Sequence, residues 1–414
     1  CVLSVCDASK ALWGLDLESW AWRALMPALI LGGNVAGFTL FIVAVLRMAT
    51  WWRDHRHARW EWRRGTLWWM AYFGLQLLGG LWSNDLDAWR LSLEVKSSLW
   101  FFPVLLAMPG RRVARDFWWS LGWSVTVYLS WRMLRAGWHH VVLGVPTEWR
   151  YARFSGDAHP TYMSLHLAAA FLGLGSQWGR TLKPKMLWAI TLLFALSLDM
   201  LGSKAGIIAA LVVAAIRLYM MGPLWGRKVG AALSASLPQG ALRWCFFMAL
   251  VLFSAWALSG KRFAEMSSAS AVMTDAQAPV QSSSSGRVKV WQTSWEIMES
   301  HPFGVGTGDV VPELMRRYER DGLTYASERR LNPHNQWLQA GVAFGWPGIL
   351  VLTVALFSGL IMAWRLGEGT LLLCVTLVVL HAGVESVLEA QRGVVFIMWM
   401  LMVQLPVADK TSGA

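Results

Sequence analysis

Long apolar runs, separated by short charged clusters, constrain the fold of this chain more than any other sequence feature. They cover residues 24–48, 66–82, 91–109, 117–138, 160–177, 187–202, 205–222, 244–259, 338–363, 369–386 and 393–407. A helix needs about 20 apolar residues to cross a membrane, where lipid offers no partner for backbone N–H and C=O groups. The sequence therefore predicts an all-α integral membrane protein, a polytopic bundle of about 11–12 transmembrane helices.

Composition agrees with a membrane protein and argues against a nucleic-acid partner. Hydrophobic residues make up 56% of the 414 residues and charged residues 15%, whereas soluble proteins average about 25% charged. The net charge of +12 would suggest nucleic acid in a soluble chain, but here the basic residues gather in short loops between apolar runs. We therefore expect membrane lipid, and no nucleic acid, as a partner.

Four loops carry the basic clusters, and the order of the apolar runs puts all four on one side of the membrane. The clusters are Arg53 to Arg64, Arg111 to Arg115, Arg180 to Lys185 and Arg227 to Arg243. The positive-inside rule makes that side cytoplasmic. The chain then divides into an N-terminal transmembrane bundle (1–259), a large outer loop with catalytic residues (260–337) and C-terminal transmembrane helices (338–414). Because an odd number of crossings puts the N-terminus outside, we suspect a further crossing within residues 1–22.

The large outer loop is predicted to be partly helical. Its first part, Met266 to Ser285, is rich in Ser and Ala and predicts a mobile loop. Apolar residues at helical spacing follow Gly286 and predict a helix that lies against the membrane. The sequence His301-Pro302-Phe303 ends this helix, and residues 309–320 predict a second one.

Cationic side chains at the outer ends of the apolar runs are candidate functional residues, because charge near lipid is costly. They are Lys96, Arg153, Lys204 and Arg287, together with His159 before a predicted helix start. A helix start suits an anion, and arginine grips phosphate through two parallel hydrogen bonds. The competing interpretation is that these side chains are structural. Their charged groups would reach the membrane surface by snorkelling, or, for Lys96, form an ion pair with Glu94 or Asp87. No cluster has metal-ligand spacing and no nucleotide motif occurs, so the pattern suits a diphosphate held by cations, without metal or cofactor.

His334 is the candidate for proton transfer. It lies in Leu331-Asn332-Pro333-His334-Asn335, just before the next predicted crossing. An imidazole, with an ordinary pKa near ~6.5, is the side chain best suited to move protons at neutral pH. A lone histidine is usually structural, but the position of His334 on the same membrane face as the cations favours a catalytic role.

The chain resembles the O-antigen ligase and polymerase superfamily from about residue 66 onward. The motifs that carry the resemblance are Trp82-Ser83, Lys96 before a Pro-containing helix, Ser203-Lys204-Ala205-Gly206, Gly286-Arg287, His301-Pro302-Phe303-Gly304-Val305-Gly306-Thr307-Gly308, His334-Asn335-Gln336-Trp337-Leu338 with Gly345 and Gly348, and Glu385-Ser386. The most specific of these are the glycine-rich turn and the His-Asn pair before a crossing.

The resemblance implies a bacterial inner-membrane glycosyltransferase, similar to type C glycosyltransferases, whose active site and large loop face the periplasm. Such an enzyme moves a glycan from undecaprenyl diphosphate to lipid A-core by an inverting, metal-independent reaction in lipopolysaccharide biosynthesis. By the same resemblance His334 is the essential histidine, Arg287 the loop arginine, and Lys204 and Lys96 the other basic positions.

Other outer residues complete the predicted site. Arg153 would help to hold the diphosphate, Glu385 would orient His334 or contact the acceptor, and His159 and Asn335 are secondary candidates. The nearest alternative activity is an O-antigen polymerase or an O-oligosaccharyltransferase that uses the same lipid-linked donor. A transporter without chemistry is the alternative from another class, but we find no matched pair of Gly/Pro-broken helices in the two halves of the chain.

Overall fold

The computed structural model describes residues 2–32, 34–110, 113–220 and 283–408. The predicted crossing at 244–259 and most of the low-complexity stretch from Met266 to Ser285 lie outside these residues. So do the basic residues Arg111, Arg112, Arg227, Lys228 and Arg243. Over the described ranges the secondary structure is helical, with no strand and a single isolated bridge between Arg63 and Val407. The predicted all-α class is therefore confirmed.

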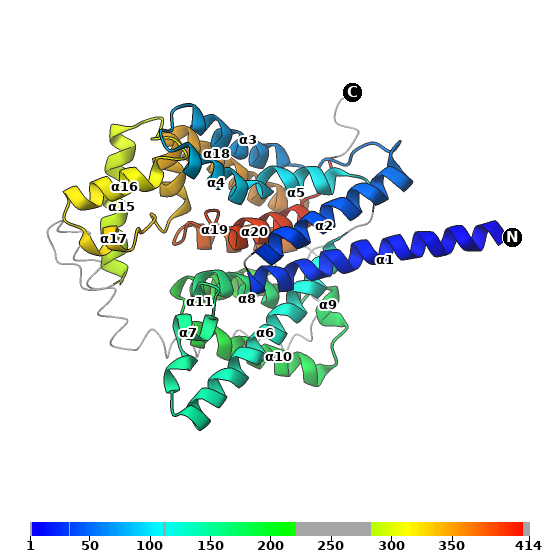
Figure 1. The fold of residues 1–414 in the computed structure, drawn as a ribbon. Coiled ribbons are helices and arrows are strands. Elements are labelled where there is room, and N and C mark those ends of the chain that lie inside the picture. The colour runs from blue at the N-terminus through cyan, green and yellow to red at the C-terminus, as the bar shows by residue number, and fades with distance from the viewer. Residues whose placement is uncertain (1, 33, 111–112, 221–282, 409–414) are drawn as a thin grey trace.

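The helices follow the predicted apolar runs closely (Figure 1). Their bounds are α1 (Val2–Leu31), α2 (Asn34–Thr50), η1 (Trp51–His55), α3 (Thr66–Leu78), η2 (Gly79–Leu81), α4 (Leu86–Lys96), α5 (Ser98–Ala107), α6 (Ala114–Leu143), η3 (Pro146–Trp149), α7 (Tyr151–Ser155), α8 (Pro160–Gly173), α9 (Gln177–Arg180), α10 (Pro184–Leu201), α11 (Lys204–Met220), α15 (Ser283–Ser300), α16 (Val310–Arg320), α17 (Thr324–Glu328), α18 (Gln336–Leu366), α19 (Gly369–Ala382) and α20 (Gln391–Gln404).

Several of these helices are suited to lipid. Three described stretches are long and apolar enough to cross a membrane: Asn34–His55, Pro184–Leu201 and Gln336–Leu366. Lys204–Ile216 and Gly369–Ala382 are shorter apolar helices. Two predicted runs are divided: 24–48 breaks at Gly32, where φ is +76°, and 91–109 breaks between α4 and α5. The chain is a helical membrane protein, and the count of crossings stays a prediction.

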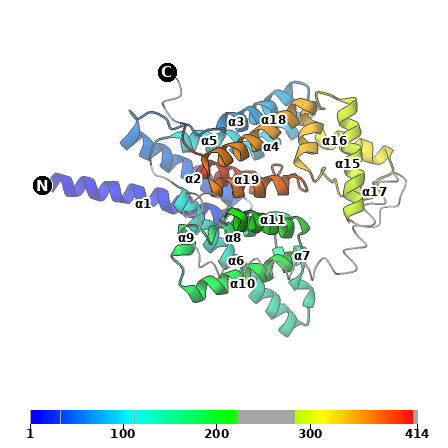
Figure 2. The same ribbon diagram turned by 180° about the vertical axis from the view of Figure 1, so that it is seen from behind.

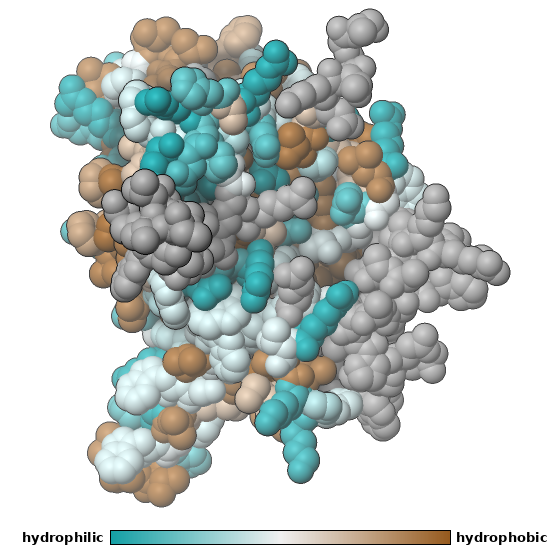
Figure 3. Space-filling model, turned by 90° about the vertical axis from the view of Figure 1, so that its right-hand side faces the viewer, coloured by the Kyte–Doolittle hydropathy of each residue, from teal (hydrophilic) through white to brown (hydrophobic). Residues whose placement is uncertain are grey.

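The molecule has two chemically different ends. Helices α15, α16 and α17 lie together at one end, and α9 and the start of α1 lie at the other, in both Figure 1 and Figure 2. Figure 3 looks onto the second end, where hydrophilic residues are interspersed with hydrophobic ones. The connection from α2 to α3, which contains the basic cluster from Arg53 to Arg64, also lies toward this second end (Figure 1). The basic cluster from Arg53 to Arg64 and the short helix α9, which ends at Arg180, thus lie toward the end opposite α15–α17.

The glycine-rich turn after α15 fixes the polar end to the helical body. Val305 N donates to Val342 O at 2.9 Å, and Gly306 N donates to Ala343 O at 3.0 Å. Helix α18 is interrupted at Gly345, where φ is +62° and an added Cβ would lie 1.8 Å from Pro302 O. Only glycine tolerates this backbone at so close an approach. The motif is therefore a structural joint between the α15–α17 segment and α18.

Candidate active site

The start of α18 places His334 and Asn335. Asn335 Oδ1 accepts from Trp337 N at 2.9 Å and Leu338 N at 3.1 Å, so this side chain caps the helix. Its Nδ2 donates to Gly383 O at 3.0 Å, which ties the cap to the loop between α19 and α20. His334 has φ +46°, an uncommon conformation for a residue other than glycine. Strained backbone of this kind occurs often at functional sites.

His334 contacts Glu385 directly. Nδ1 lies 2.9 Å from Oε1, and the side chains are 20% and 4% exposed respectively. Burial of Glu385 opposes its ionisation, but the hydrogen bond and charge of His334, with the charges of His159 and Arg287, hold its pKa below the usual value. An ionised carboxylate can only accept, so Nδ1 carries the proton and Nε2 is the free basic nitrogen.

Arg287 and Lys204 meet near the starts of α15 and α11. Lys204 Nζ donates to Ser284 Oγ at 2.8 Å, which joins the two helices. Ser284 and Arg287 are three residues apart and lie on the same side of α15. The charge of Arg287 acts on both Glu385 and His159, so the guanidinium lies within electrostatic reach of the His334–Glu385 pair. Arg287 is thus linked to the His334–Glu385 pair through its charge, and Lys204 contacts α15 at Ser284, one turn before Arg287.

Lys96 belongs to a buried network beside this site. Its Nζ lies 2.7 Å from Glu389 Oε2 and donates to Gln76 Oε1 at 3.1 Å, and the side chain is 4% exposed. Gln336 Nε2 donates to Glu389 Oε1 at 3.2 Å, and Gln336 Oε1 accepts from Leu388 N at 2.8 Å. The partner of Lys96 is thus Glu389, not Glu94 or Asp87. A direct contact with phosphate would require this ion pair to open.

His159 and Arg153 lie at the border of the site. Burial lowers the pKa of His159 below its usual value, and the charges of His334 and Arg287 act in the same direction while Glu385 opposes them. His159 Nδ1 also accepts from Thr161 N at 3.4 Å, which caps α8. The exposed Arg153 donates to Thr147 Oγ1, on the side of η3. His159 therefore lies in the electrostatic field of the site, whereas the contact of Arg153 is directed elsewhere.

Sequence reasoning missed several residues of this site, namely Glu389, Gln336, Gln76 and Ser284. Glu389 lies in the same short loop between α19 and α20 as Glu385, and that loop offered a signal because an acidic residue between two apolar runs needs a partner. Within the residues that the structure describes, no group of three or more His, Cys, Asp and Glu could hold a metal ion. The site is a set of cations around a histidine–carboxylate pair.

The comparison with protein families adds independent information. Residues 189–353 match a family described as O-antigen ligase. This segment extends from within α10 into α18 and contains Lys204, Arg287 and His334. A search of curated proteins finds no match. The motifs and this match agree, and residues 189–353 are similar to the O-antigen ligase family.

Proposed function

We propose that this protein is an O-antigen ligase, which transfers a glycan from undecaprenyl diphosphate to lipid A-core at the periplasmic face of the bacterial inner membrane. The observation that carries the proposal is the His334–Glu385 contact of 2.9 Å at the start of α18, with Arg287 and Lys204 beside it. A histidine with an orienting carboxylate suits a hydroxyl nucleophile, and adjacent cations suit a diphosphate leaving group.

The placement of charge supports this orientation in the membrane. The site lies at the end of the molecule that holds α15 to α17, opposite the end with α9 and the basic α2–α3 connection (Figure 1). Basic loops favour the cytoplasm, so the site would open to the periplasm. In this arrangement residues 1–259 and 338–414 form the membrane bundle, and residues 260–337 are the periplasmic loop that brings Arg287 and His334 to the membrane surface.

In the proposed reaction His334 Nε2 takes the proton of an acceptor hydroxyl, a role typically worth about 100- to 10,000-fold in rate. The acceptor oxygen forms a bond to the anomeric carbon of the donor sugar from the face opposite the diphosphate. The bond from that carbon to the diphosphate oxygen breaks, its electron pair leaves with the diphosphate, and the anomeric configuration inverts. Arg287 and Lys204 neutralise the charge that develops on the leaving group, so the transfer needs no metal and no cofactor.

The other predicted residues take supporting roles in this proposal. Lys96, held by Glu389, positions the loop that carries Glu385, and Asn335 fixes the same loop through Gly383 O. His159 contributes to the electrostatic environment of the pair. Arg153 would meet the distal part of the diphosphate or its sugar once it leaves Thr147.

The test is transfer by the purified full-length protein in detergent with EDTA, given undecaprenyl diphosphate-linked glycan and lipid A-core. We expect an extended lipid A-core product from the wild type and from the control His140→Asn. His140 lies on α6, and its Nδ1 accepts a hydrogen bond from Trp149 of η3. His334→Asn keeps a residue that tolerates positive φ and should lower the rate of product formation by about 100-fold or more. Arg287→Ala should lower kcat strongly.

The identity of the product separates the alternatives. If the wild type joins one lipid-linked glycan to another and leaves lipid A-core unchanged, the protein is a polymerase. Transfer to a protein acceptor would indicate an O-oligosaccharyltransferase. An absence of any transfer, with an active control enzyme, would contradict an enzymatic role and favour a transporter.

A further inference from the structure

An open groove lies on the polar end of the molecule, away from the His334–Glu385 pair. Its volume is about 1040 Å³, and its lining includes Trp82, Arg90, His301, Glu313 and Arg316. Arg287 and His301 are at opposite ends of α15, a separation of about 20 Å at 1.5 Å per residue. The groove is therefore distinct from the site that holds the diphosphate. Its volume is at the upper end of the range of ligand pockets, large enough for more than one sugar ring.

The floor of the groove is rigid. Asp309 Oδ2 accepts from Asn84 N at 2.8 Å and from Asn84 Nδ2 at 2.9 Å, and its Oδ1 accepts from Asp85 N at 2.9 Å. Gly308 N donates to Ser83 Oγ at 2.9 Å. These bonds fasten the turn before α4 to the turn before α16. A ligand would thus meet a preorganised surface, which reduces the entropy lost on binding.

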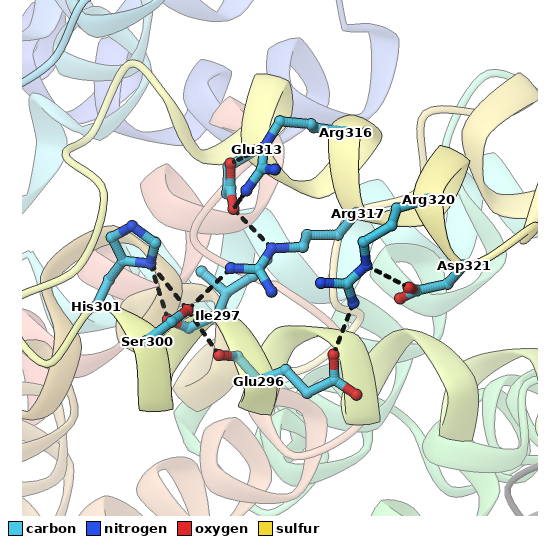
Figure 4. Close-up of polar contacts among 9 residues, drawn as sticks. All are labelled: Glu296, Ile297, Ser300, His301, Glu313, Arg316, Arg317, Arg320 and Asp321. Carbon is cyan, nitrogen blue, oxygen red and sulfur yellow. Dashed lines mark hydrogen bonds and ion pairs between the residues drawn. The ribbon is translucent and has the colours of Figure 1, made fainter.

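One wall is formed by α16 and the end of α15 (Figure 4). Glu313 receives two hydrogen bonds from Arg316, at 2.7 and 2.6 Å, and one from Arg317 at 2.8 Å. Arg317 also donates to Ser300 Oγ at 2.9 Å, which joins the two helices. His301 Nδ1 lies 3.0 Å from Ser300 Oγ and 3.3 Å from Ile297 O, which fixes the imidazole against the end of α15. The wall presents planar polar groups held in fixed positions.

Trp82 adds an aromatic surface to these polar groups. Its side chain is 42% exposed, and its indole N–H has no hydrogen-bond partner among the residues that the structure describes. The face of an indole carries negative charge in its π system and attracts the C–H groups on the flat side of a pyranose ring. Planar guanidinium, carboxylate and imidazole groups then suit neighbouring hydroxyls, because each offers donors or acceptors at fixed spacing.

The charge of the groove limits which ligand fits it. Its charged residues are the carboxylates Asp85, Asp87, Asp309 and Glu313 and the guanidiniums Arg90 and Arg316. The balance is negative, unlike the cationic site around Arg287. Phosphorylated sugars would therefore be repelled, and uncharged sugars accepted.

We propose that this groove binds an uncharged oligosaccharide, with Trp82 as the stacking surface and Arg90, His301 and Arg316 as hydrogen-bonding groups. The inference rests on the proposed function, since it assigns the groove to a glycan of that reaction. Two glycans share this chemistry: the outer sugars of the lipid A-core acceptor, and the repeat units of the donor that lie away from the diphosphate.

The experiment measures binding to the purified full-length protein in detergent by saturation-transfer NMR and by titration calorimetry. The probes are core oligosaccharide and O-polysaccharide, each released from lipopolysaccharide by mild acid and free of lipid. We expect Trp82→Ala to raise the Kd for one of these two glycans about tenfold, because an aromatic contact is lost. Trp82→Phe should restore most of the affinity. Trp138→Ala is the matched control, because Trp138 is an exposed tryptophan (62%) on α6.

A loss confined to core oligosaccharide assigns the groove to the acceptor, and a loss confined to O-polysaccharide assigns it to the donor. Unchanged binding of both by Trp82→Ala, or equal losses in Trp82→Ala and Trp138→Ala, would overturn the proposal. Because binding is measured without turnover, an inactive wild type would contradict the proposed function while leaving the groove testable.

Discussion

Replacement of Glu385 by glutamine tests how the histidine–carboxylate pair works. The contact with His334 is 2.9 Å long, and the Glu385 side chain is 4% exposed, so solvent screens it little. Hydrogen bonds to a charged group contribute about 1.5–3 kcal/mol and neutral ones about 0.5–1.5 kcal/mol. In the proposed reaction His334 becomes cationic as it takes the proton, and the imidazolium–carboxylate bond is then stronger than the imidazole–carboxylate bond of the resting state. A loss of about 1.3 kcal/mol, the difference between the two mid-range values, therefore falls on the transition state. We expect kcat to fall about tenfold in Glu385→Gln.

The separate values of kcat and KM provide a second readout that a merely structural role would not give. The contact with His334 acts on the proton transfer, so Glu385→Gln should lower kcat and leave the KM of both substrates close to that of the wild type. Initial rates of glycan transfer over a series of donor and acceptor concentrations measure both constants. Wild-type kcat in the variant would refute the assignment of Glu385 as the partner of a general base.

Three further outcomes are expected. Lys96→Met leaves Glu389 without its cation and should lower the free energy of unfolding in detergent by about 3–5 kcal/mol, the cost of breaking a buried pair. The double variant Lys96→Met with Glu389→Gln should unfold at a higher temperature than Lys96→Met alone. A lower unfolding temperature of the double variant would contradict the pairing. Partial burial of Glu313 opposes its ionisation, but hydrogen bonds from Arg316 and Arg317 hold its pKa below the usual value. Ionised Glu313 therefore stabilises the fold fully above the pKa that it has in the unfolded chain, and this stabilisation is lost as pH falls through its lower pKa in the folded protein. The unfolding temperature of Glu313→Gln should consequently depend less on pH in this acidic range than that of the wild type. Gly345→Ala places a methyl group against Pro302 O and should abolish folding or lower the unfolding temperature sharply; wild-type stability would show that the turn is not a rigid joint.

The helices were predictable from the sequence because a segment that crosses lipid must be both apolar and helical, so a long apolar run by itself predicts a helix. The predicted runs at 187–202 and 338–363 correspond to α10 and α18, and the helices predicted after Gly286 and over 309–320 are α15 and α16. Breaks inside the runs were not predicted. Gly32 and Gly345 end or interrupt helices through positive φ, and hydropathy carries no information on φ.

The site was predictable in its residue types and less so in its contacts. His334, Arg287 and Lys204 were selected because charged or titratable groups near lipid are costly, and Glu385 was selected through the family resemblance. In the structure His334 contacts Glu385, the charge of Arg287 acts on Glu385, and Lys204 contacts Ser284. The partner of Lys96 was predicted among its neighbours in sequence, yet it is Glu389, on a loop close only in the folded chain. Such a pairing depends on how α4, α18 and the α19–α20 loop pack together, which local patterns do not encode.

The measurement that tests the central claim most directly is the initial rate of glycan transfer from undecaprenyl diphosphate to lipid A-core, by purified wild type and His334→Asn in EDTA. The account predicts an extended lipid A-core with an inverted anomeric linkage from the wild type, and a rate lower by about 100-fold or more in the variant. Equal rates in the two proteins, or a product with retained configuration, would contradict it.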